Sequence, residues 1–292
     1  MSFIDAVSPR SGGGAAPQVA ADLAQDAARL CHDLAAEPLL QLDALAVAAA
    51  RLPQDAIERR VHDAADGAGF RILPPLADLP QRLAEHGPQD EWVMLKQLER
   101  LPEYAALFAR LMAALPKEVL RATGAPQELR SFVFLSAPHT HTPLHFDAEY
   151  NVLFQVAGTK TFATFPAREP FVTRAAREAY HRTGENLLEM TAAHAAGERR
   201  HELAPGDALF VPYCAPHWVR SGPAASISLS LTWQSAWSRD VADALRIAPM
   251  LRRCGLVLAD PAPTGRPPRL AALASRALQR AERLAGRGRS PG

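Results

Sequence analysis

The sequence predicts a core of β-strands flanked by helical segments on both sides. Between about residues 130 and 234, short runs rich in β-branched and aromatic residues follow one another, separated by glycine, proline and polar turns. The segments before and after this region instead carry apolar residues at steps of three and four, which is typical of amphipathic helices. A series of short strands of this kind favours a β-sandwich or a β-barrel. We therefore expect one mainly β core with helical flanks that cover its outside.

Length, composition and charge fit this prediction. The chain has 292 residues, of which 48% are hydrophobic and 22% charged, ordinary values for a protein that buries a sizeable core. The formal net charge is +1, so no overall field favours nucleic acid or an anionic membrane as partner. The three cysteines are far apart and odd in number, which argues against a disulfide framework. With no secretory leader pattern and no apolar run of about 18 residues, we expect a cytoplasmic protein.

The N-terminal part divides into two segments. Residues 1–17 are rich in glycine, serine, alanine and proline, and we expect them to be disordered. Residues 18–129 are expected to form a helical flank with short strands that packs on the β core. Within this flank, the apolar spacing of residues 20–34 predicts a helix. Residues 92–95 predict a buried strand, and Pro102 predicts the start of a second helix.

The β core is expected over residues 130–234, and the C-terminal helices and a basic tail over residues 235–292. The predicted strands cover residues 131–135, 151–156, 160–165, 208–212 and 226–233. A polar insert with helical stretches lies between Pro166 and Pro205.

The last helix, about residues 268–285, carries an arginine stripe that we expect to face solvent. The arginines are Arg269, Arg276, Arg280, Arg283 and Arg287, and the expected packing face is Leu270, Ala274, Ala277, Ala281 and Leu284. A homodimer through the C-terminal helices, or an acidic partner, stays open.

Two short motifs predict a metal site. His145 and Asp147 lie two residues apart in the extended run TPLHFD (142–147), so their side chains project to the same side. His217 follows a turn, a strand and a proline-rich corner in PGDALFVPYCAPHW (205–218), and it is the candidate for the third ligand. Two histidines and one carboxylate leave open positions on Fe(II), where a co-substrate and O₂ bind. An isolated His-x-Asp pair is common by chance, and neighbours such as His139 and His141 allow a surface cluster instead.

Residues 142–166 resemble the core motif of JmjC and cupin-like 2-oxoglutarate-dependent oxygenases. Thr142 and a proline precede His145, Asn151 follows His145 by six residues, and Lys160 follows it by fifteen. The second motif, PGDALFVPYCAPHWV, is similar to the strand-turn-strand that carries the family's distal histidine. The likeness covers about residues 130–234 and is greatest to the asparaginyl hydroxylase that inhibits hypoxia-inducible factor. The two motifs are specific together and only moderately so alone.

This resemblance implies a double-stranded β-helix, the cupin or JmjC jelly-roll barrel, with Fe(II), 2-oxoglutarate and O₂. The three metal ligands would form the catalytic centre. Lys160 and Thr142 would hold the distal carboxylate of 2-oxoglutarate, and Asn151 would lie near its iron-bound end. The implied reaction is hydroxylation of a C–H bond, in a peptide or protein side chain or in an amino-acid-like small molecule.

The physical sense of Lys160 is that a dianion in a narrow barrel needs a buried cation. Lys160 is one of only three lysines in a chain with 29 arginines, although a solvated strand residue is the alternative reading. One feature departs from the family: the strand near Trp92 lacks the tyrosine that the hydroxylase uses against 2-oxoglutarate. The last strand also presents a small polar face, which fits a pocket lining and a solvent face equally. That face is Ser226, Ser228, Ser230 and Thr232.

Two other classes of function stay open. One is a cupin metalloenzyme that uses no 2-oxoglutarate, against which Lys160 and Thr142 argue. The other is a non-catalytic cupin-like binding module, against which the intact metal triad argues. Cys214 is a possible sulfur ligand, but we expect it to be a small packed residue instead. Asp207 is expected to stabilise the turn at residues 205–207 and not to bind the metal.

Overall fold

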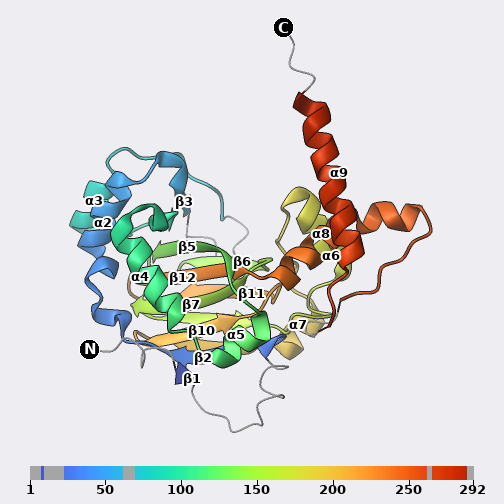
Figure 1. Cartoon of the computed structure of the whole chain (residues 1–292). Coiled ribbons are helices and arrows are strands. Elements are labelled where there is room, and N and C mark those ends of the chain that lie inside the picture. Colours follow the sequence, from blue (N-terminus) through green and yellow to red (C-terminus); the bar gives the residue numbers. More distant parts are fainter. Residues whose placement is uncertain (1–7, 10–22, 62–69, 262–264, 288–292) are drawn as a thin grey trace.

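Two antiparallel β-sheets form the centre of the computed structural model, which describes residues 8–9, 23–61, 70–261 and 265–287 (Figure 1). The larger sheet contains, in spatial order, β1 (Ser8–Pro9), β2 (Ala28–Cys31), β10 (Asp207–Val211), β7 (Tyr150–Ala157), β12 (Ser226–Gln234), β5 (Gln127–Ser136), β4 (Glu91–Lys96) and β3 (Ile57–Val61). The smaller sheet contains β6 (His141–His145), β11 (His217–Ser221), β8 (Lys160–Thr164) and β9 (Arg199–Leu203). The mainly β core with helices around it is confirmed, whereas its closure into a double-stranded β-helix stays a prediction.

Helices before and after the core complete the fold. They are α2 (Leu42–Arg51), α3 (Leu79–His86), α4 (Pro102–Ala113), α5 (Lys117–Thr123), α6 (Arg174–Thr183), α7 (Ala192–Gly197), α8 (Ala236–Arg253) and α9 (Arg269–Arg287). The strand predicted near Trp92 and the helix predicted to start at Pro102 are confirmed as β4 and α4. β9, inside the polar insert, was not predicted. Among the described helices, none combines the length and apolarity that crossing a bilayer requires.

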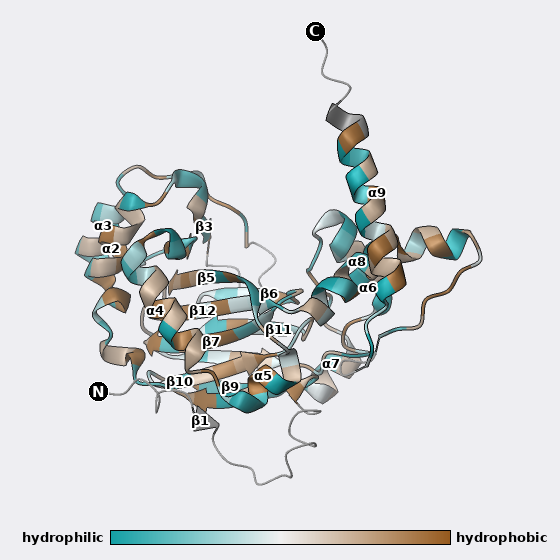
Figure 2. Ribbon diagram, viewed as in Figure 1, coloured by the Kyte–Doolittle hydropathy of each residue, from teal (hydrophilic) through white to brown (hydrophobic). Residues whose placement is uncertain are grey.

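The central strand β12 separates the hydrophobic core from the cavity of the site. Its Leu229, Leu231 and Trp233 are fully buried in the main hydrophobic cluster, together with residues of α2 and α4. Figure 2 shows hydrophobic residues along the strands and on the helices beside the large sheet. The opposite face of β12 is also buried, and its Ser230 and Thr232 line a cavity between the two sheets. The small polar face therefore belongs to the interior and not to solvent.

The helix predicted over residues 20–34 is wrong for its described part. Residues 28–31 form β2, which pairs with β10 and aligns Leu30 with Ala208. Leu30 and Leu34 are buried as expected, but they are buried beside a sheet. The free edge of β10 offers a row of backbone hydrogen bonds, and this tertiary pairing outweighs a weak local preference for helix. Of the segment predicted to be disordered, 1–17, only residues 8–9 are described, and they form β1.

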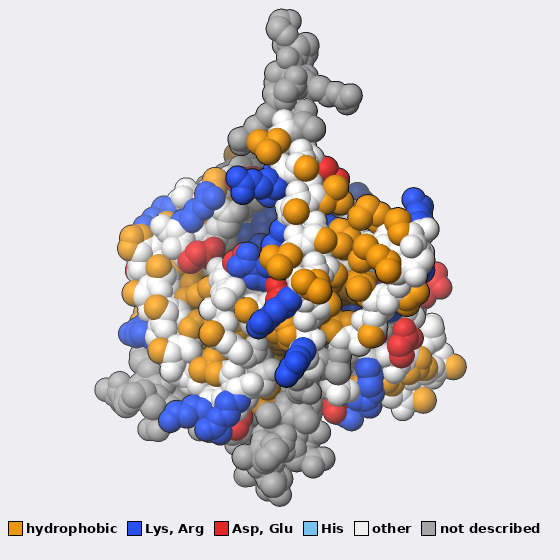
Figure 3. Space-filling view, turned by 45° about the vertical axis from the view of Figure 1, so that its right-hand side comes forward, with side chains coloured by type: hydrophobic (Ala, Val, Ile, Leu, Met, Phe, Trp, Pro, Cys, Tyr) orange, Lys and Arg blue, Asp and Glu red, His pale blue; other side chains and the backbone are white. Residues whose placement is uncertain are grey.

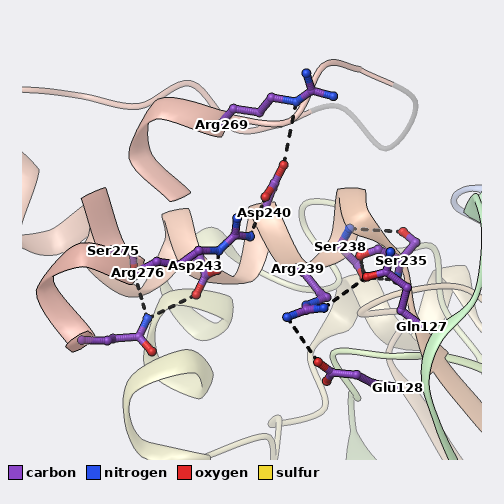
Figure 4. A network of polar contacts seen from close by, with 11 residues as sticks. Gln127, Glu128, Ser235, Ser238, Arg239, Asp240, Asp243, Arg269, Ser275 and Arg276 are labelled. Atoms are coloured by element: carbon purple, nitrogen blue, oxygen red, sulfur yellow. Dashed lines mark hydrogen bonds and ion pairs between the residues drawn. The ribbon is translucent and has the colours of Figure 1, made fainter. Parts of the chain in front are cut away.

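The C-terminal helix α9 packs differently from its predicted faces. The described arginines of the stripe are exposed as expected, although Arg276 also forms ion pairs: its Nη2 and Nε lie 2.6 Å from carboxylate oxygens of Asp240 and Asp243 on α8 (Figure 4). Leu270 is 86% exposed although it was assigned to the packing face. Small buried residues of α9, including Ala272, let the two helices approach, and the acidic turn of α8 attracts the arginine. Figure 3 shows hydrophobic and basic side chains gathered on this exposed side of the molecule.

Candidate metal centre

The pairing of β6 with β11 brings the three predicted metal ligands together. His145 ends β6 and His217 begins β11, and these two residues face each other in the antiparallel register. The centres of their rings are 4.2 Å apart. Asp147 follows β6 by two residues, and its Oδ2 lies 3.8 Å from Nε2 of His145 and 3.7 Å from Nε2 of His217. Atoms that share a metal at bonds of about 2.1 Å lie roughly 3–4 Å apart, so this spacing suits one ion.

Backbone hydrogen bonds hold both imidazoles in the orientation that a metal requires. With the proton on Nδ1, His145 donates to the carbonyl of Pro143 at 2.8 Å, and His217 donates to the carbonyl of Ala215 at 3.0 Å. Each Nε2 therefore keeps a free lone pair that points to the same place. Burial is the main cause that lowers the pKa of His217 to about 4, so this ring is neutral and available as a ligand at neutral pH.

Asp147 is held by contacts on three of its groups. Its Oδ2 faces the two imidazoles, whereas its Oδ1 accepts a 3.4 Å hydrogen bond from Nδ2 of Asn186. Its backbone carbonyl accepts a hydrogen bond of 2.9 Å from the N–H of Cys214, in the corner that leads to His217. The two metal motifs are thus linked directly through the backbone.

The triad opens into a cavity of about 540 Å³ between the two sheets. Thr142, Asn151 and Lys160 line this cavity together with the three metal ligands, so the structure brings all six predicted site residues to one place. Strands of the N-terminal flank also contribute: β4 supplies Trp92 and Met94. The resemblance drew attention to this strand only through its missing tyrosine, and the place of these two side chains depends on the pairing of β4 with β5.

Lys160 lies at the far end of the cavity from the triad. It starts β8 and pairs with Ser221, whereas Thr164, at the other end of β8, pairs with His217. Four residues of strand separate these points by roughly 13 Å. The side chain of Lys160 is buried, and its Nζ lies 5.7 Å from the ring centre of Phe134. Burial lowers its pKa from 10.5 to about 7, and no described carboxylate offsets this effect.

Further polar groups of the cavity wall are unsatisfied. The Oδ1 of Asn151 and the Oγ of Ser230 are buried and have no hydrogen-bond partner in the part of the chain that the structure describes. Burying an unsatisfied polar group costs about 1–3 kcal/mol, so such groups mark where a ligand or water binds. The role of Ser230 was not foreseen beyond its place on the polar face of its strand.

Other candidate ligands have structural roles. Cys214 is buried outside the triad, and burial raises the pKa of its thiol to about 12, which disfavours a thiolate ligand. His141 stacks on Trp218 with ring centres 5.4 Å apart. Asp207 serves its turn as predicted, since its Oδ2 accepts a hydrogen bond from the N–H of Ala204 at 3.0 Å.

Comparison with known proteins returned only structural likenesses. No protein-family model matches the chain, and no curated protein sequence matches it. A crystal structure of the ribosomal oxygenase YcfD from Escherichia coli has a TM-score of 0.48 and 15% identity, covering 94% of this chain and 68% of that chain. YcfD in complex with cobalt and 2-oxoglutarate has a TM-score of 0.46 and 16% identity, with 82% and 58% covered. In another YcfD structure, with a TM-score of 0.47 and 18% identity, this chain spans 59% of the length of that chain. The sequence likeness to the asparaginyl hydroxylase stays a prediction.

Proposed function

We propose that this protein is an Fe(II)- and 2-oxoglutarate-dependent oxygenase that hydroxylates a C–H bond. One observation carries the proposal: a triad of two histidines and one aspartate lies at one end of a cavity, and a buried lysine lies at the other end. A metal alone would need only the triad. The lysine adds a buried cation to the wall of the same cavity, where it would pair with the second carboxylate of a dicarboxylate bound to the metal.

The donor set of the triad fits Fe(II). Two imidazoles and one carboxylate form the facial arrangement of non-haem iron oxygenases, with positions left open for ligands that react. A structural zinc site would instead be closed by a fourth protein ligand. No such ligand belongs to the cluster in the described part of the chain, since Cys214 lies outside it.

The far wall of the cavity fits the other end of 2-oxoglutarate. Lys160 offers an ammonium, and Thr142 lines the same cavity. Ser230 adds a buried hydroxyl that lacks a partner among the described residues, in a cavity where β4 contributes no tyrosine. Asn151, also unsatisfied at its Oδ1, is assigned to the iron-bound end of the co-substrate. A carboxylate would accept hydrogen bonds from the ammonium and the hydroxyls, and would restore the charge that burial disfavours on Lys160.

The protein's own groups position the reactants and exclude water. Bound iron with 2-oxoglutarate and O₂ supplies the oxidising chemistry. His145 and His217 keep their Nε2 lone pairs on the metal through their backbone hydrogen bonds. Phe162 stacks on His217 with ring centres 5.0 Å apart, which fills the space beside the ligand with a hydrophobic ring. Lys160 fixes the length and direction of the co-substrate from the far end.

The substrate side of the cavity is formed by the N-terminal flank and the insert after the core motif. Glu58 and Arg60 of β3, Trp92 of β4 and Leu187 line it. An aromatic and charged opening of this kind supports a peptide or protein side chain as substrate, or an amino-acid-like small molecule. A homodimer through the C-terminal helices is a separate proposal, supported by the exposed Leu270 and other leucines of α9, and light scattering of the purified chain tests it.

The proposed function is tested by anaerobic reconstitution with Fe(II), followed by addition of 2-oxoglutarate and air. We expect succinate to form, and the Asp147→Ala variant to form none. A protein that binds Fe(II) but neither binds nor consumes 2-oxoglutarate would be a different cupin metalloenzyme. A protein that retains no metal would favour a non-catalytic binding module.

A further inference from the structure

We infer that Asn186 is a positioning residue that keeps Asp147 bound to the metal through one oxygen only. Asn186 lies in residues 184–188, a segment named here the strap, which follows α6 in the insert between β8 and β9. The inference rests on the proposed function only in taking the resident ion to be Fe(II), because the contacts themselves concern any ion held by the triad.

Backbone hydrogen bonds attach the strap to the metal-binding motif. The N–H of Leu188 donates to the carbonyl of Leu144 at 2.9 Å, and the N–H of Phe146 donates to the carbonyl of Asn186 at 3.2 Å. Between these two bonds, Leu187 and His145 face each other in an antiparallel bridge. The strap thereby covers the outer edge of β6, which is the edge strand of the smaller sheet. Its backbone position beside the His-x-Asp motif is set independently of any side chain.

From this position, the side chain of Asn186 contacts Asp147. Its Nδ2 lies 3.4 Å from Oδ1 of Asp147, while Oδ2 of the same carboxylate faces both imidazoles. The two oxygens of Asp147 thus have different partners, and the amide engages the one turned away from the metal position. A carboxylate whose second oxygen accepts a hydrogen bond from an amide N–H is held against rotating into two-oxygen coordination.

The chemical consequence is the number of free metal positions. A triad with a one-oxygen aspartate leaves three positions of an octahedral ion open, two for a chelating co-substrate and one for O₂. If Asp147 bound through both oxygens, it would occupy one of these three. Asn186 is suited to this role because its amide is neutral, whereas a second carboxylate at that distance from Asp147 would repel it.

The strap also lines the substrate side of the cavity. Leu187 is 57% exposed and, like Asn186, belongs to the cavity wall. The strap begins at Gly184, which ends α6 with φ +80, a conformation that favours glycine. A substrate that touches Leu187 would therefore contact the same segment that carries Asn186.

The experiment compares the full-length wild type with Asn186→Leu, which has the same branched shape but no donor. Glu189→Gln is the matched control, because Glu189 is exposed on the same insert and lies outside the cavity wall. Co(II) is titrated anaerobically into each protein while its visible absorption spectrum is recorded. Hydrogen exchange of the Phe146 and Leu188 amides reports whether the strap stays docked.

We expect the dissociation constant for Co(II) to rise about tenfold in Asn186→Leu, since loss of a hydrogen bond to a metal ligand costs 10- to 100-fold and this bond is long. We also expect an altered Co(II) spectrum, unchanged amide protection and a control like wild type. Unchanged affinity and spectrum would overturn the inference. So would a loss of affinity accompanied by loss of amide protection, since the strap backbone would then be responsible. Absence of succinate formation in wild type would refute the oxygenase while leaving this Co(II) result to be judged separately.

Discussion

Replacing Lys160 by methionine should abolish tight binding of 2-oxoglutarate while leaving the metal site intact. Methionine keeps the length and volume of the side chain, so no cavity is created. Burial lowers the pKa of Lys160 from 10.5 to about 7. At about 1.4 kcal/mol per pKa unit, burial disfavours its ammonium by about 5 kcal/mol. We therefore expect a bound anion to stabilise the ammonium, and the distal carboxylate of the co-substrate is that anion in the proposed function.

The magnitude follows from leaving a carboxylate without its cation. Breaking a buried ion pair by removal of one partner costs about 3–5 kcal/mol. This corresponds to an increase of roughly two to three and a half decades in the dissociation constant of 2-oxoglutarate. Thr142→Val removes one hydrogen bond to a charged group and should cost only about 1.5–3 kcal/mol. The loss of affinity for 2-oxoglutarate should therefore be larger in Lys160→Met than in Thr142→Val.

Calorimetric titration of 2-oxoglutarate into the anaerobic Co(II)-loaded protein measures these constants directly. Lys117→Met is the control, because Lys117 is exposed at the start of α5 and lies outside the cavity. Co(II) affinity should be the same in all variants, since neither Lys160 nor Thr142 belongs to the triad. A Lys160→Met protein that binds 2-oxoglutarate like wild type would refute the assignment of the far wall and, with it, the oxygenase proposal.

Four further outcomes are expected. Affinity for 2-oxoglutarate should fall by up to tenfold per pH unit above about pH 7, because the free protein then has a neutral Lys160, which must take up a proton on binding. Calorimetric titrations in buffers of different ionisation enthalpy measure this proton uptake. Asp147→Ala should lose Fe(II) in equilibrium dialysis, and retention of one ion per chain would rule out the triad. Leu229→Ala, in the fully buried core face of β12, should lower the free energy of unfolding by about 2–5 kcal/mol in urea titrations, with a smaller loss contradicting its place in the core. A fragment of residues 130–234 lacks β2, β3 and β4 of the large sheet and should aggregate, whereas a cooperative thermal transition would show that the flanks are separate domains.

The metal half of the site could be predicted because its information is local. His145 and Asp147 are two residues apart in an extended run, and strand geometry alone turns them to one side. His217 and Lys160 needed the resemblance to a family as well, because only the pairing of β11 with β6 and β8 brings them near. The strands were found for a similar reason, since alternation and turn residues are properties of short segments.

The errors arise where pairing over long distances decides the structure. Residues 28–31 follow a helical spacing, yet they form a strand because β10 has an edge to pair with. Leu270 was assigned to the packing face of α9, yet it is 86% exposed, because α9 packs on α8 through Ala271 and its neighbours instead. Asn186 carries no local signal, since an asparagine in a polar insert is ordinary until the strap is attached to β6.

The groups proposed to carry the chemistry and the wall proposed to face the substrate come from different parts of the chain. The groups proposed to hold iron and 2-oxoglutarate lie on β6, β7, β8, β11 and β12 and on the loop after β6, all within the central region where sequence signals are strong. The part of the wall proposed to face the substrate comes from β3, β4 and the strap, two of which belong to the flank and one to an insert. A fixed reaction requires a fixed geometry around the metal, whereas a choice among substrates is made by the wall that faces them. Under the proposed function, the groups that would choose the substrate therefore lie on segments whose place beside the cavity depends on long-range pairing, which the sequence pattern alone did not predict.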